Sequence, residues 1–83
     1  MAVRLHPHAV QRLEERGAEA NEVVETVEHG EQFPAKFGRT GFRRNFRLEN
    51  DWRGKHYATK QIEAVAVREA SDWLVLTAIT RFF

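Results

Sequence analysis

The fold class is decided by a seven-residue stretch in the middle of the chain, Phe42-Arg43-Arg44-Asn45-Phe46-Arg47-Leu48. Its apolar residues alternate with Arg43, Asn45 and Arg47, and a period of two predicts a β-strand with one apolar face and one basic face. Arg44 interrupts the apolar side of the pattern. The stretch therefore predicts a half-buried strand, and its flanks show how the rest of the domain is built.

The segment before this strand has helical spacing. Apolar residues three and four positions apart predict one helix over residues 8–16 and a second over residues 20–29. Gly17 follows the first helix, where a left-handed C-terminal cap is needed, and Gly30 ends the second. We therefore expect two consecutive helices joined by a short turn.

The segment after this strand returns to a period of two. Asn50-Asp51 and Gly54 provide turn residues, and a short strand is expected over residues 55–60. Two further strands are expected over residues 62–68 and 73–82, and the last is apolar on both faces, which predicts a place in the middle of the sheet. The fold prediction is an α+β domain, residues 1–83, with the N-terminal helix pair packed on one face of a three- to four-stranded antiparallel sheet.

Charge is segregated along the chain although the net charge is only +1. Residues 14–31 contain seven glutamates and one arginine, a net charge of −6. Residues 36–60 contain eight basic residues and two acidic ones, a net charge of +6. This distribution predicts a basic surface, turned away from the glutamate-rich second helix, that meets a polyanion.

Length and composition restrict the class of protein. Eighty-three residues make one domain with a thin core, and the absence of cysteine is typical of a reducing compartment. The chain has no apolar stretch long enough to cross a membrane or to act as a signal peptide. We therefore expect a soluble cytoplasmic protein that has no contact with a membrane.

The basic residues of residues 36–60 are the first candidate site. A row of arginines on one strand face can follow a phosphate backbone while nearby aromatic rings stack on bases. The alternatives are that the arginines protect an edge strand and that Phe42 and Phe46 belong to the core. Together with two arginines of the first helix, the candidate nucleic-acid-binding residues are Arg12, Arg16, Arg39, Arg43, Arg44, Arg47, Arg53 and Lys55.

The first helix carries a second candidate site. His8, Arg12 and Arg16 are four residues apart, which places each beside the next on a helix, and a neutral imidazole beside a guanidinium suits a general base. The alternative is a solvated helix on which Arg12 and Arg16 pair with Glu15 and Glu19. His6 and His8 have too few companion ligands for zinc, so we expect neither a metal nor a cofactor.

A third candidate site lies in the short strand of residues 55–60. It supplies an imidazole, a phenol and an ammonium group, and metal-free RNA cleavage needs a base, an acid and cations that stabilise the extra negative charge. The candidate catalytic residues are His8, His56, Tyr57 and Lys60.

The opening pattern His-x3-Arg-x3-Arg-Gly, residues 8–17, resembles a family of small bacterial proteins known only as a domain of unknown function. That family is grouped with the RelE/barnase/EndoU/colicin class of ribonuclease toxins, and residues 33–46 and 52–61 are also similar to one of its subgroups. The resemblance implies a RelE/barnase-like fold and maps the family's opening histidine and arginines to His8, Arg12 and Arg16. The family's usual Ile-Ser after the glycine is Ala18-Glu19 here, so the serine cap of the second helix is missing.

Two main classes of function follow, and a structural or interaction role that involves no nucleic acid is a third. The first is a metal-independent endoribonuclease of toxin type, in which attack by the 2′-hydroxyl group leaves a cyclic phosphate. The second is a non-catalytic module that binds nucleic acid or protein through residues 36–60. The expected partners are RNA, an acidic antitoxin-like protein and a second copy of the chain.

Overall fold

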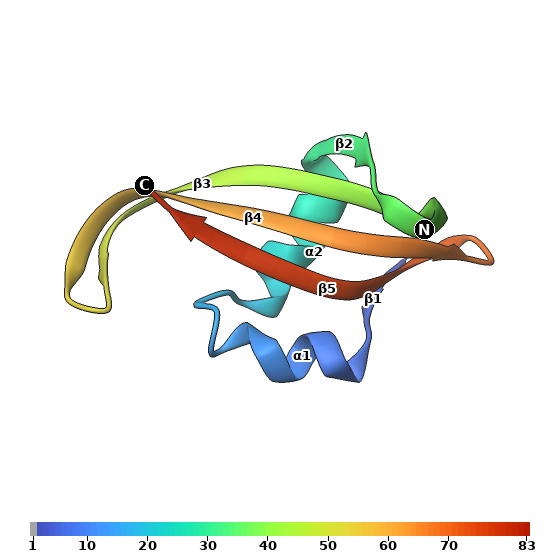
Figure 1. Cartoon of the computed structure of the whole chain (residues 1–83), viewed down its shortest axis with the longest axis horizontal. Helices are drawn as coiled ribbons and strands as arrows, with labels where there is room; N and C mark the ends of the chain where they lie inside the picture. The colour runs from blue at the N-terminus through green and yellow to red at the C-terminus, as the bar shows by residue number, and fades with distance from the viewer. Residues whose placement is uncertain (1) are drawn as a thin grey trace.

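The computed structural model describes residues 2–83 and shows an α+β fold with a mixed sheet. The helices are α1 (Pro7–Leu13) and α2 (Ala20–His29), with a short 3-10 turn η1 (Lys36–Gly38). The strands are β1 (Val3–Leu5), β2 (Glu31–Pro34), β3 (Thr40–Trp52), β4 (Lys55–Glu69) and β5 (Asp72–Phe82). Within these residues the strands form one sheet in the order β1-β5-β4-β3-β2 (Figure 1).

The sheet differs from the predicted antiparallel meander at its first strand. β1 pairs in parallel with Trp73–Val75 of β5, whereas the other neighbouring strands are antiparallel. Three residues are too few to show a period, so the sequence pattern missed β1. The α+β class is confirmed, but the number of strands and the purely antiparallel arrangement were wrong.

The middle of the sheet is occupied by β4 rather than by β5, which corrects a second expectation. β1 covers only three residues of β5, so the edge of β5 beyond Val75 has no neighbouring strand in the described chain. The apolar residues on the second face of β5 are half-buried or exposed instead of being covered. The segments 55–60 and 62–68 form one continuous strand because Gln61 preserves the alternation between them.

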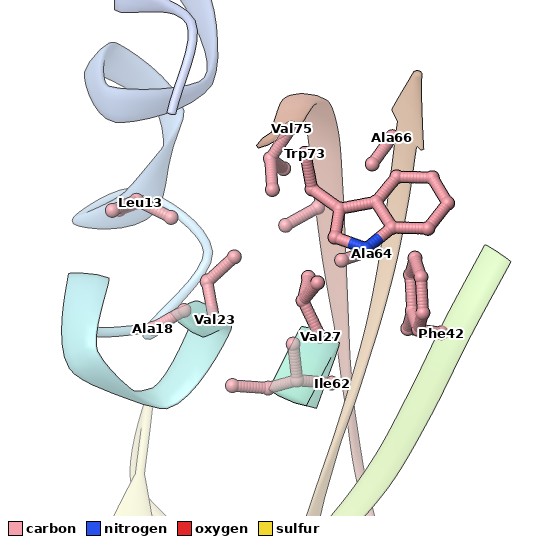
Figure 2. Close-up of a cluster of buried hydrophobic side chains, with 11 residues drawn as sticks. Leu13, Ala18, Val23, Val27, Phe42, Ile62, Ala64, Ala66, Trp73 and Val75 are labelled. Carbon is pink, nitrogen blue, oxygen red and sulfur yellow. The ribbon is translucent and has the colours of Figure 1, made fainter. Parts of the chain in front are cut away.

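Both helices pack through one face of the sheet, α2 against β3 and β4 and α1 against β5. The core between these layers combines apolar side chains of both helices with Phe42, Ile62, Trp73 and Val75 (Figure 2). Ala64 and Ala66 lie on the core side of β4, where their small side chains allow α2 to approach the sheet. Neither α1 nor α2 covers the opposite side, here called the open face.

Helix α1 ends at Leu13, three residues before the predicted end. The chain turns at Gly17, whose φ is +70°, and the Ala18 N–H donates to the Leu13 carbonyl. The predicted left-handed conformation of Gly17 is therefore confirmed. Although the serine is missing, the start of α2 keeps one half of a capping box, since the Glu22 carboxylate accepts a hydrogen bond from the Glu19 N–H at 2.9 Å.

The β3–β4 hairpin extends beyond the other strands and curls away from the sheet (Figure 1). Its tip is a two-residue turn of Arg53 and Gly54, both with positive φ, as hairpins of this length require. The predicted place of Gly54 in the turn is confirmed, whereas Asn50 and Asp51, also suggested as turn residues, are paired residues of the strand. We call residues 48–58 the arm. In the described part of the chain no helix is both long and apolar enough to span a bilayer.

Candidate nucleic-acid interface

Three polar residues of β3 form a line on the open face, and we call Arg43, Asn45 and Arg47 the basic row. Their cross-strand partners on β4 are Glu63, Gln61 and Thr59, which share that face. Alternate residues on one strand face are about 6.6 Å apart. The predicted separation of Arg43, Asn45 and Arg47 from Phe42 and Phe46 is confirmed, since Phe42 is buried in the core and Phe46 packs against it.

The members of the basic row differ in how far their charge is compensated. Arg43 forms ion pairs with Glu31 at 3.3 Å and Glu63 at 3.5 Å, and its guanidinium lies 4.6 Å from the ring centroid of Phe33. The Asn45 side-chain carbonyl accepts a hydrogen bond from the Gln61 amide at 3.0 Å. Arg47 is exposed and has no ion pair within the described residues. Arg43 is therefore held in position, whereas Arg47 presents an uncompensated charge.

The rest of the basic block is divided between the two ends of β3. Lys36 and Arg39 flank Phe37 at η1, just before β3 begins. Arg53 and Lys55 lie at the tip of the arm, where Arg53 donates a hydrogen bond to the Glu15 carbonyl at 2.9 Å. The eight basic residues of the block consequently do not form one continuous patch.

Two members of the block point to the helices, which corrects the expectation that all of it lies away from α2. Lys60 is buried and donates to the Gly17 carbonyl and to Glu22 Oε1, each at 2.7 Å. Arg44 lies 3.9 Å from Glu25 and donates to the His29 carbonyl at 3.4 Å. Even-numbered positions of these strand segments face α2, so both cations neutralise its glutamates.

Two candidate arginines come from the region of α1: Arg12 lies within the helix, and Arg16 follows it and contacts β5. The Arg16 guanidinium donates to the Thr77 hydroxyl group at 3.3 Å and to the Ala78 carbonyl, on the part of β5 that has no neighbouring strand. Arg16 and Arg53, distant in sequence, line one cavity of about 320 Å³ together with Phe82. Arg12 is half-buried on α1 and has no ion pair among the residues described.

The candidate catalytic histidines lie at opposite ends of the molecule. His8 is in the first turn of α1, next to His6, whose N–H donates to the carbonyl of Val75. Val75 pairs with Ala66, ten residues along β4 from His56, which is about 33 Å in an extended strand. His56 instead lies between two carboxylates, 3.2 Å from Asp51 and 3.6 Å from Glu49.

The four candidate catalytic side chains therefore do not converge. Tyr57 is half-buried, with its ring centroid 5.3 Å from that of Phe82, and the Lys60 ammonium is held by Glu22. Neither histidine lies beside Arg43, which is seven residues along the sheet from His56. Arg43 and Arg47 share one face of the sheet, and Arg16 and Arg53 line one cavity, whose described lining contains no histidine.

Three neighbours of the candidate interface could not be identified from the sequence. Phe33 and Glu63 contact Arg43 through strand pairings whose register the sequence pattern does not specify. The exposure of Phe37 was also missed, although its position beside Gly38 and between two cations was a signal. Glu63 compensates the charge of Arg43, and the two rings contact Arg43 and Arg39.

Comparisons of the chain with protein-family models, with curated proteins and with solved structures found no match. The resemblance to the ribonuclease toxin class stays a prediction from the sequence.

Proposed function

We propose that this protein is a non-catalytic RNA-binding module that contacts the phosphate backbone through the basic row on the open face of its sheet. The observation that carries the proposal is the alignment of Arg43, Asn45 and Arg47 on a face that no helix covers. A row that presents guanidinium and amide donors at regular intervals suits a single strand, whose successive phosphates it can contact. RNA is named as the polyanion because the sequence resembles a class of RNA-directed toxins.

The ion pairs of Arg43 support a binding role for the row. Glu31 and Glu63 hold its guanidinium over the ring of Phe33, so little conformational entropy is left to be lost when a phosphate binds. Arg47 supplies the charge that the glutamates do not compensate. An acidic protein partner and a homodimer remain predictions from the sequence.

Replacement of Arg47 by alanine tests the proposal. We expect weaker binding to a single-stranded RNA of mixed sequence, together with a slope of log affinity against log salt that is smaller by about 0.7, because one phosphate contact is lost. Fluorescence anisotropy over a series of salt concentrations measures both quantities.

Arg68→Ala is the matched control for this experiment. Arg68 is also an exposed arginine of the sheet, but it lies at the far end of β4 and stacks over Trp73. Its removal changes the net charge equally and should leave the salt slope unchanged. Equal effects of the two substitutions would show that binding follows overall charge and would contradict a site at the basic row.

The endoribonuclease hypothesis makes a separate prediction. A positioned acid or base accelerates a reaction by roughly 10²–10⁴-fold, so a catalytic His8 or His56 would show a loss of that size on replacement by alanine. His8 lies at the other end of the molecule, and the His56 imidazole is paired with Asp51 and Glu49, three residues along β4 from the partner of Arg47. We therefore expect His8→Ala and His56→Ala to bind RNA with wild-type affinity and to leave any cleavage rate unchanged. A gel assay with labelled RNA and a metal chelator checks this, and a large loss in either variant would restore the catalytic hypothesis.

A further inference from the structure

Phe37 combines two features that the stability of the fold does not explain. Its side chain is 87% exposed, although apolar side chains of the sheet beside it, such as Phe33 and Val65, are half-buried. Its backbone also has a φ of 62° and a ψ of 35°, in the left-handed region that bulky residues rarely adopt. A phenylalanine in this position is exposed at a cost to folding, which is the pattern of a residue kept for binding.

The conformation of Phe37 is fixed by the residues around it. Gly38 follows with a φ of 70°, so two successive residues adopt the left-handed region. The Ala35 N–H donates to the Arg39 carbonyl at 3.0 Å, and the Arg39 N–H donates to the Lys36 carbonyl at 3.2 Å. These bonds close the turn η1.

A cavity of about 400 Å³ lies beside this turn on the open face. Its lining combines Phe33, Val65 and Thr77 of the sheet with Lys36, Phe37 and Arg39 at the turn η1. The Arg39 guanidinium lies 5.7 Å from the ring centroid of Phe37. The acidic residue of the lining, Glu63, is paired with Arg43 at 3.5 Å and with Arg81 at 2.8 Å, so the charges of Lys36 and Arg39 are uncompensated there.

We propose that this cavity binds an unpaired base of single-stranded RNA, which stacks on Phe37 while the flanking phosphates contact Lys36 and Arg39. The proposal rests on the proposed function and specifies its ligand as a single strand. An apolar cavity with a cationic rim is complementary to a flat aromatic group that carries anionic neighbours on both sides. A neutral protein segment, or an acidic one without an aromatic residue, matches only one of these two properties.

The position of the cavity supports the same ligand. Arg39 immediately precedes β3, and Arg43 begins the basic row four residues later, about 13 Å along the strand. One continuous strand of RNA can therefore pass from Phe37 to Arg43 and on to Arg47 on the same face. A duplex, whose bases are paired and stacked internally, cannot supply a base to the ring.

The test compares Phe37→Leu and Phe37→Trp with the wild-type protein in binding to two RNAs. One is a single strand of mixed sequence, and the other has the same backbone with abasic sites. We expect Phe37→Leu to lose roughly 5- to 150-fold in affinity for the normal strand, the usual range for one stacked base, and Phe37→Trp to retain wild-type affinity. On the abasic strand, wild-type protein and Phe37→Leu should bind equally weakly.

Phe83→Leu is the matched control, because Phe83 is also an exposed phenylalanine but lies at the end of β5, away from the cavity. It should bind both RNAs as the wild type does. Equal affinities of wild-type protein and Phe37→Leu for the normal strand would overturn the stacking inference and leave the basic row intact. A wild-type protein that binds no RNA at low salt would overturn both proposals, and a dimer that Phe37→Leu dissociates in sedimentation would identify a second copy as the occupant.

Discussion

Replacement of Lys60 by alanine is expected to lower the free energy of unfolding by about 3 kcal/mol, the lower end of the range for a buried ion pair that loses one partner. The ammonium group joins the sheet to the Gly17 carbonyl and to Glu22, and the lysine side chain is only 8% exposed. Glu22 also caps the start of α2, so loss of Lys60 leaves a partly buried carboxylate at the junction of both helices.

Urea unfolding followed by circular dichroism measures this change. Lys55→Ala is the matched control, since Lys55 is an exposed lysine of the same strand, and we expect a change within about 0.5 kcal/mol there. A Lys60→Ala protein as stable as Lys55→Ala would contradict the structural role. Loss of an RNA-cleaving activity without loss of stability would instead return Lys60 to the list of catalytic candidates.

Ile62→Ala is expected to lower the free energy of unfolding by roughly 2–5 kcal/mol, because it leaves a cavity in a close-packed core. Ile62 has no exposed surface and lies in the core cluster between the sheet and α2 (Figure 2). Ile79→Ala makes the same chemical change on β5, where the side chain is 37% exposed. Urea unfolding of both variants should show the larger loss for Ile62, and equal losses would mean that α2 does not cover this part of the sheet.

Local patterns predicted the elements whose signals lie within one stretch of sequence. The valines and glutamates of residues 20–29 alternate with a helical period, and α2 has the bounds that they predicted. The same holds for the two faces of β3, because a side chain's face depends only on its own position in the strand. The end of α1 was less accurate, since the last apolar residue of its pattern is Leu13 and the polar residues 14–16 form a turn that leads to Gly17.

Elements and contacts that depend on distant partners were not predictable in this way. β1 is three residues long and takes its partner from the opposite end of the chain. The central position of β4 and the pairing of Lys60 with Glu22 depend on strand order and on how α2 crosses the sheet. A count of charges along residues 36–60 therefore included cations that the fold uses internally.

The parallel pairing of β1 also has a consequence for the order of events during synthesis. Val3–Leu5 meets its partner only after Trp73–Val75 has been made, and at roughly 5–20 residues per second the ribosome takes about 4–14 s to add the intervening 70 residues. The start of α1 is held by the same part of β5, because the His6 N–H donates a hydrogen bond to the Val75 carbonyl. On the nascent chain, β1 and α1 are therefore among the last elements of the domain to form their native contacts.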